Sequence, residues 1–213
     1  MTLSSLGLPR LYPILDHEVL ARHRCDLTDA AQALVDAGCT FLQYRNKVDP
    51  ASRFLNQAQH LRQHLPHHSC RLLLNDRVDL ARLAGFEGAH VGQTDLTPAD
   101  ARRVLAPGQI LGLSTHSFEQ FQAALEQPVD YIAVGPVFAT ASKADPDPVV
   151  GLDLLRRVRA LTAKPIVAIG GITPLNAPAV IEAGADSVAL ISALFAAGQP
   201  LGASARELIR LLT

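Results

Sequence analysis

Two carboxylates and three cations stand shortly after apolar stretches of the sequence. The carboxylates are Asp76 and Asp95, and the cations are Arg45, Lys47 and Lys143. In a parallel β/α barrel the carboxyl ends of the strands share one face, and active sites lie there. Two carboxylates without a thiolate or a paired imidazole suit a hard, hydrated cation, which indicates Mg²⁺. The three cations indicate a polyphosphate ligand, because carboxylates alone would repel one.

Small residues after the last two apolar stretches indicate a second anion site. These residues are Gly170-Gly171 and Ile191-Ser192. Barrels commonly bind a monophosphate at this point through backbone N–H groups, and glycine lets the backbone approach the phosphate closely. One site with a metal and one without indicate a transfer between two substrates rather than an isomerisation. Either aspartate taken alone would also fit the N-cap of a helix.

The elements that must position these residues form a regular alternation. Short β-rich apolar stretches are each followed by a segment of helical periodicity, which predicts parallel strands joined by helices. The predicted strands are Leu11–Leu15, Thr40–Tyr44, Arg71–Leu74, Gly88–Val91, Ile110–Leu113, Tyr131–Val137, Pro165–Ile169 and Ser187–Ile191. Predicted helices between them include Leu27–Ala37, Ala51–His64, Asp153–Leu161 and Leu175–Ala183.

Local signals mark the ends of these helices. Asp26 and Thr28 supply capping oxygens near the start of Leu27–Ala37, and Gly38 follows as a stop signal. Eight strand–helix units favour an α/β fold of the (β/α)8 TIM-barrel type. An open, doubly wound sheet is the alternative.

Composition places the chain among single-domain proteins of the cytoplasm. Its 213 residues suit one domain spanning 1–213, somewhat short for a barrel that usually needs about 250. The formal net charge of −1 gives no footprint for nucleic acid or an anionic membrane. No signal peptide or membrane-spanning stretch is expected, and the three cysteines are expected to be reduced thiols. Small-molecule substrates are therefore the expected partners, and the oligomeric state stays open.

The order and spacing of short motifs add a family resemblance from Leu11 to about Ala197. The chain resembles the thiamine-phosphate synthase family, although no single motif is decisive. The motifs are Gln43-Tyr44-Arg45-Asn46-Lys47, Asn75-Asp76-Arg77, His90-Val91-Gly92-Gln93-Thr94-Asp95, Gly112-Leu113-Ser114, Gly135-Pro136-Val137-Phe138, Thr140 to Lys143, Ile169-Gly170-Gly171-Ile172 and Ile191-Ser192.

The resemblance implies a TIM barrel that makes thiamine phosphate. The implied substrates are 4-amino-5-hydroxymethyl-2-methylpyrimidine pyrophosphate and a thiazole phosphate or its carboxylated form. In this family the bond between the pyrimidine methylene and oxygen breaks first, and the thiazole nitrogen captures the resulting cation. Pyrophosphate is the second product.

The resemblance also assigns roles by position. Asp76 and Asp95 would hold Mg²⁺. The pyrophosphate would be held by Arg45, Lys47, Asn75 and Lys143. Ser114 would lie near the leaving end, so Arg45, Lys47, Ser114 and Lys143 are the implied catalytic residues. Gln43 and His90 would line the pyrimidine pocket. The thiazole phosphate would be bound by Thr140, Ser142, Gly171, Ile191 and Ser192.

Some positions depart from the family pattern. Tyr44 and Asn46 replace the Leu and Glu often found inside the first motif, and strand alternation predicts that they point away from the cations. Ser142 keeps the hydroxyl of the usual threonine, and Ser187 replaces a usual glycine. The long segment Ala139–Val149, which carries Lys143, is expected to close as a lid.

Three other functions compete with this interpretation. A thiazole tautomerase shares the barrel and the thiazole site and could use His116, but has no need for the metal and pyrophosphate residues. A non-catalytic phosphate-binding barrel would be expected to lack one of the charged positions. Another phosphate barrel, such as an isomerase, would need an acid–base pair at strand ends, and Cys39 precedes its strand.

Overall fold

Eight parallel strands close into a barrel in which each strand pairs with the next and β8 pairs with β1. The computed structural model of the chain describes residues 7–65, 67–140, 147–195 and 198–213. The strands are β1 (Leu11–Asp16), β2 (Phe41–Arg45), β3 (Arg71–Asn75), β4 (Gly88–Val91), β5 (Ile110–Thr115), β6 (Tyr131–Val134), β7 (Ile166–Ile169) and β8 (Ser187–Leu190). The predicted TIM barrel is confirmed, and the predicted strands differ only at their ends.

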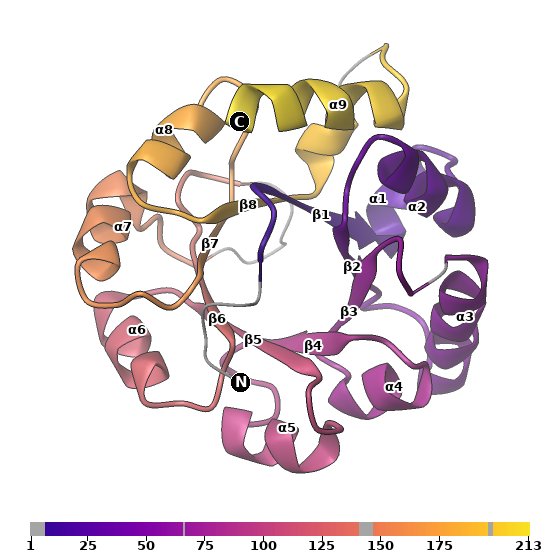
Figure 1. Cartoon of the computed structure of the whole chain (residues 1–213), viewed down its shortest axis with the longest axis horizontal. Coiled ribbons are helices and arrows are strands. Elements are labelled where there is room, and N and C mark those ends of the chain that lie inside the picture. The colour runs from indigo at the N-terminus through magenta and orange to yellow at the C-terminus, as the bar shows by residue number, and fades with distance from the viewer. Residues whose placement is uncertain (1–6, 66, 141–146, 196–197) are drawn as a thin grey trace.

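Helices surround the ring of strands, as Figure 1 shows. They are α1 (His17–Arg22), α2 (Leu27–Asp36), α3 (Ala51–His64), α4 (Val78–Leu83), α5 (Pro98–Val104), α6 (Phe118–Leu125), α7 (Gly151–Arg159), α8 (Ala177–Glu182) and α9 (Leu201–Leu212), with a short 3₁₀-helix, η2 (Ser192–Leu194), after β8. The predicted helix ends are confirmed at α2, where the Asp26 carboxylate accepts backbone N–H bonds from Thr28 and Asp29. Gly38 follows with a φ of +100°, which glycine adopts without strain.

Strand β6 is shorter than predicted. It ends at Val134, whereas the sequence predicted a strand to Val137. Gly135 and Pro136 follow Val134, and proline has no N–H to donate to a neighbouring strand. A Cβ atom at Gly135 would lie 2.0 Å from the carbonyl oxygen of Ile169 on β7, so the two backbones approach closely here.

Two apolar cores lie on the two sides of the barrel wall. The larger one fills the space between strands and helices, and includes Leu34 of α2, Phe54 of α3 and Phe121 of α6. The smaller one fills the barrel interior with side chains from Tyr12, Ile14, Phe41, Leu73, Ile110, Tyr131, Ala133, Val167 and Ala189. The interior is therefore packed below the pocket that opens at the carboxyl ends of the strands.

The amino ends of the strands carry a repeated polar arrangement, which we call the strand-start clamp. An acidic residue directly precedes each of β4, β6 and β8, namely Glu87, Asp130 and Asp186. Each carboxylate accepts a 2.7 Å hydrogen bond from a backbone N–H at the start of the preceding strand, contributed by Leu72, Leu111 and Ile166 respectively.

The same carboxylates also pair with arginines of the preceding helices. Arg62 of α3 donates to Glu87 at 2.9 Å, Arg102 of α5 pairs with Asp130, and Arg159 of α7 donates to Asp186 at 2.7 Å. Each guanidinium also donates to at least one carbonyl oxygen of the loop between its helix and the next strand, and Arg102 donates in addition to the Pro128 carbonyl before β6. Each clamp thus joins a helix, the strand after it and the next strand.

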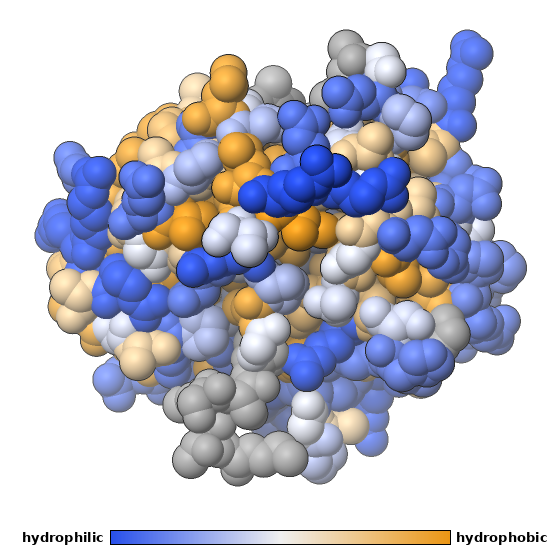
Figure 2. Space-filling view, turned by 45° about the horizontal axis from the view of Figure 1, so that its top comes forward, coloured by the Kyte–Doolittle hydropathy of each residue, from blue (hydrophilic) through white to orange (hydrophobic). Residues whose placement is uncertain are grey.

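The outer surface mixes hydrophilic and hydrophobic side chains. On the face in Figure 2, apolar residues lie between hydrophilic ones. Within the described ranges, no helix is long and apolar enough to cross a membrane.

Candidate active site

A pocket of about 380 Å³ opens at the carboxyl ends of the strands and gathers most of the predicted site residues. The predicted residues that line it are Gln43, Arg45, Lys47, Asn75, Asp76, His90, Asp95, Ser114, Thr140 and Ile191. They come from six of the eight strands or the segments after them. Residues predicted from separate stretches of the sequence therefore line one cavity.

The carboxylates of Asp76 and Asp95 lie within hydrogen-bonding reach of each other beside the ends of β3 and β4. Lys47 forms an ion pair with Asp76, and Asp95 accepts a 2.7 Å hydrogen bond from the backbone N–H of Gly92. Burial and the facing Asp95 carboxylate raise the pKa of Asp76 above its usual range, against the lowering effect of Lys47. Two converging carboxylates of this kind repel each other unless a cation or a proton lies between them.

This carboxylate pair fits Mg²⁺. Among the described residues, no group of three or more His, Cys, Asp or Glu side chains could hold a metal ion, so the candidate in this part of the chain is a pair of carboxylates. Mg²⁺ is commonly held by one or two carboxylates together with waters and substrate phosphates. The pair therefore suits a cation that arrives with a phosphate-bearing substrate.

Asp16 holds Arg45 in place at the edge of the pocket. Its carboxylate pairs with the Arg45 guanidinium and also accepts a 3.0 Å hydrogen bond from the Val19 N–H at the start of α1. Asp16 is 4% exposed. It is not among the predicted site residues, because the predicted strand ended at Leu15. Its position directly after an apolar stretch was the signal that could have identified it.

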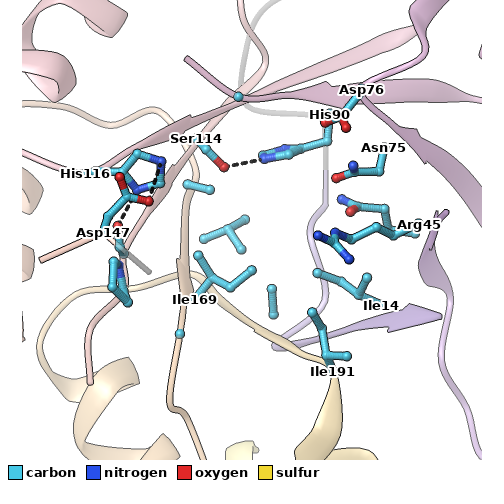
Figure 3. Close-up of a pocket in the computed structure, with 18 of the residues that line it drawn as sticks. Ile14, Arg45, Asn75, Asp76, His90, Ser114, His116, Asp147, Ile169 and Ile191 are labelled. Atoms are coloured by element: carbon cyan, nitrogen blue, oxygen red, sulfur yellow. Dashed lines mark hydrogen bonds and ion pairs between the residues drawn. The ribbon is translucent and has the colours of Figure 1, made fainter. Parts of the chain in front are cut away.

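A polar wall faces the carboxylates from β4 and β5. His90 Nε2 lies 2.7 Å from Ser114 Oγ, and Gln93 donates to the backbone carbonyl of Ser114 at 2.6 Å. Figure 3 shows Arg45, Asn75, Asp76 and His90 on one side of the pocket and Ser114 on the other. Tyr44 and Asn46 point away from the pocket as predicted, since Tyr44 donates to Gln57 of α3 at 2.9 Å.

The opposite part of the pocket is apolar. Ile14, Ile169 and Ile191 project from β1, β7 and the end of β8 into the cavity in Figure 3. Val167 and Ala189 complete this surface. An apolar surface facing a charged one suits a ligand with a flat ring at one end and an anionic group at the other.

The predicted monophosphate residues occupy the rim near β7 and β8. Gly170 and Ile191 line the pocket, and Gly171 and Ser192 follow them directly in the chain. Gly171 has a φ of +64°, and a Cβ atom there would lie 2.3 Å from the carbonyl oxygen of Ala139. Glycine is thus required where this backbone meets the start of the segment after β6. Ser142 and Lys143 lie outside the described residues, as does most of the predicted lid.

His116 also lines the pocket, although the sequence suggested a role for it only in the rival tautomerase. Its Nδ1 lies 2.6 Å from the carbonyl oxygen of Gly135, and its Nε2 lies 3.5 Å from the Asp147 carboxylate. Both residues line the pocket. This contact fastens the segment that returns to α7 against the end of β5.

Comparisons with known proteins identify the family of the chain. The family model described as thiamine monophosphate synthase matches residues 11–194. A thiamine-phosphate synthase from Koribacter versatilis is 55% identical over 90% of this chain and 91% of its own length. Another from Albidiferax ferrireducens is 43% identical over 92% of this chain and 89% of its own length.

A solved structure shows the same architecture. Thiamine phosphate pyrophosphorylase from Pyrococcus furiosus superposes with a TM-score of 0.82 at 28% identity, covering 95% of each chain. The chain therefore belongs to the thiamine monophosphate synthase family, and it is a transferase of thiamine biosynthesis.

Proposed function

We propose that the protein joins a pyrimidine pyrophosphate to a thiazole phosphate. The reaction is Mg²⁺-dependent and dissociative, and the pyrophosphate leaves from the charged side of the pocket. One observation carries this proposal: Asp76 and Asp95 converge beside Lys47, in a pocket that Arg45 and the apolar side chains of three isoleucines also line. Mg²⁺ bound by the two carboxylates would neutralise charge that grows on the leaving group. The protein's own cations would act on the same charge from fixed positions.

The side chains of β2, β3 and β5 would hold the pyrophosphate. Arg45 is fixed by Asp16, which limits its guanidinium to one direction. Asn75 lies on the same side of the pocket as Arg45 in Figure 3, with Ser114 across from it, and Lys47 also lines the cavity. Lys143 is proposed as a further ligand on the resemblance alone. Fixed donors of this kind stabilise a departing anion without the reorganisation that water would need.

The apolar wall would protect the pyrimidine cation after the carbon–oxygen bond breaks. Water would trap such a cation, so the cavity must exclude solvent and keep the thiazole nitrogen within reach. Ile14, Ile169 and Ile191 provide the water-poor surface, while Gln43 and His90 would contact the pyrimidine ring. Capture by the thiazole nitrogen forms the new carbon–nitrogen bond.

The thiazole phosphate would bind at the rim, away from the carboxylates. Gly170 and Gly171 bring bare backbone to this point, and η2 begins at Ser192. Thr140 lines the pocket from the segment after β6, and Ser142 is proposed as its neighbour in the same role. The two anions would thus occupy opposite ends of one cavity.

The test combines product formation with separate binding measurements. Purified protein incubated with both substrates and Mg²⁺ should release thiamine phosphate and pyrophosphate, and EDTA should stop the reaction. Asp95→Asn should reduce turnover by about a hundredfold or more, because the hydrogen bond from Gly92 is kept while one metal-binding charge is lost. Thiazole-phosphate binding, measured by calorimetry, should change little.

Asp153→Ala is the matched control, because this aspartate is 94% exposed on α7. It should leave turnover and binding unchanged. If Asp95→Asn retained turnover, or lost thiazole-phosphate binding as well, the assignment of the carboxylates to a separate metal site would be wrong.

A further inference from the structure

A chain of five polar side chains crosses the barrel at the floor of the pocket, and all of them except Tyr131 also line the pocket. It runs from Gln43 through Tyr12, Tyr131 and His90 to Ser114. The successive distances are 2.9, 3.2, 2.8 and 2.7 Å. The two ends, Gln43 and Ser114, are pocket residues on different strands, so the chain links two parts of the site through the core.

Strand register explains how His90 and Tyr131 meet. Gly112 of β5 is paired with His90 of β4 on one side and with Tyr131 of β6 on the other. A Cβ atom at Gly112 would lie 2.1 Å from Tyr131 Cζ and 2.5 Å from His90 Nδ1. The missing side chain leaves the space in which the tyrosine hydroxyl reaches the imidazole.

The number of protons in the chain gives it a direction. Gln43 Nε2 donates to the Tyr12 hydroxyl. Burial raises the pKa of both tyrosines far above the ordinary value, so each hydroxyl keeps its single proton. The Tyr12 hydroxyl, which accepts from Gln43, would then donate to the Tyr131 oxygen, and the Tyr131 hydroxyl would donate to His90 Nδ1. In this direction His90 would carry its proton on Nε2 and donate it to Ser114.

We propose that Tyr12 and Tyr131 are positioning residues that fix which end of this chain accepts hydrogen bonds and which end donates them. With its nitrogen held by Tyr12, Gln43 turns its amide oxygen, an acceptor, to the pocket. With its oxygen occupied by His90 Nε2, Ser114 turns its hydroxyl proton, a donor, to the pocket. Tyr131 does not line the pocket, and Tyr12 lines it but would act here through Gln43.

This polarity matches the two groups of the pyrimidine substrate, and here the inference rests on the proposed function. The amino group of the pyrimidine is a donor and suits the Gln43 oxygen. The pyrophosphate offers only acceptor oxygens and suits the Ser114 hydroxyl. Reversal of the chain would present lone pairs of Ser114 to a polyanion, and two like partners repel.

The test reads the direction of the chain without any substrate. ¹⁵N NMR of histidine-labelled protein, with His90 assigned by comparison with His90→Asn, distinguishes a protonated ring nitrogen from a bare one. Wild type should show a bare Nδ1 and a protonated Nε2. Tyr131→Phe removes the donor to Nδ1, and the two tautomers should then coexist. Tyr44→Phe is the matched control, because its buried hydroxyl bonds to Gln57 on the helix side of the barrel.

Kinetics should separate positioning from folding. Tyr131→Phe should lower kcat about tenfold, as expected for one misdirected hydrogen bond, while the KM for thiazole phosphate stays unchanged. Tyr44→Phe should lose comparable thermal stability with kcat unchanged. A wild-type spectrum with Nδ1 protonated, alone or together with Nε2, would overturn the proposal. So would an unaltered tautomer in Tyr131→Phe. Because the NMR result needs no turnover, it can fail while the proposed function stands, and the reverse also holds.

Discussion

At the scale of single residues, Asp76 combines two unfavourable features. Its φ of +61° lies in the left-handed region, which costs roughly 1 kcal/mol for a residue other than glycine, although aspartate and asparagine tolerate it best. Its carboxylate is also largely buried against that of Asp95. Strain of this kind is concentrated at functional sites, where the surrounding structure maintains it.

Asp76→Asn should therefore stabilise the metal-free protein while abolishing turnover. Asparagine accepts the left-handed backbone and removes the repulsion, and the lost ion pair is weak because Lys47 is 47% exposed. In EDTA at neutral pH we expect a melting temperature higher by on the order of a few degrees. Addition of Mg²⁺ should raise the melting temperature of wild type and leave the variant unchanged.

The pH dependence gives a second check on the same variant. Because the pKa of Asp76 is raised in the folded state, the folded metal-free protein binds this proton more tightly than the unfolded chain does. Its free energy of unfolding therefore falls as the pH rises from the ordinary aspartate pKa through the raised one. Asp76→Asn should lack that decrease. A variant less stable than wild type at neutral pH would show that Lys47 outweighs the repulsion.

The site was predictable where polar residues directly follow apolar stretches, as Asp76 and Ser114 do. Tyr12 and Tyr131 lie inside such stretches, where a tyrosine is usually interpreted as a residue of the apolar core. Their contact depends on closure of the barrel, which brings β1 and β6 together across the interior from 119 positions apart in the chain. The spacing of the two tyrosines in the sequence therefore does not indicate that they are in contact.

At the scale of elements, the strand-start clamps help to fix the register between the two strands that each of them joins. Each clamp satisfies a backbone N–H that starts a strand and also fastens the loop before it. The strands were predictable from their apolar residues, but the clamps were not. The acidic residue precedes one strand, and the arginine lies in the helix before the preceding strand, about 25 positions away in the sequence. Two surface charges so far apart in the sequence would not ordinarily be expected to interact.

Arg62→Ala should lower the free energy of unfolding by about 3 kcal/mol. The Arg62 side chain is 6% exposed, so its loss leaves Glu87 poorly compensated within a partly buried site. Denaturant titration measures the change, and the KM values should stay near those of wild type because the clamp lies at the end opposite the pocket. Arg103→Ala is the control: its pair with Asp100 is exposed, and we expect a change within about 0.5 kcal/mol. Equal effects of the two variants would contradict a special role for the clamp.

At the scale of the whole molecule, the clamps divide the barrel into successive two-strand units. Thr40 stands before β2 where the acid would be, opposite the start of β1 in the strand register, so one unit in four has an uncharged residue at this position. The barrel as a whole was predictable from its eight apolar stretches. The difference between the three clamped units and the β1–β2 unit was not predictable, because it depends on which charges face one another after the barrel closes.

Native-state hydrogen exchange should show that the clamped units open separately. In Arg62→Ala the amide of Leu72, which bonds to Glu87, should exchange faster than in wild type. The amides of Leu111 and Ile166 belong to the other two clamps and should keep their wild-type rates under conditions where the whole molecule stays folded. Acceleration of all three amides together would show that the barrel opens as one unit.

The location of the clamps also bears on how this scaffold can change over time. They hold the barrel from the strand starts, and their residues are distinct from those that line the pocket at the strand ends. Substitutions in the loops that bind the substrates can therefore occur without disturbing the contacts that keep the barrel wall closed. New chemistry can be recruited at one end of the molecule while selection for foldability acts at the other.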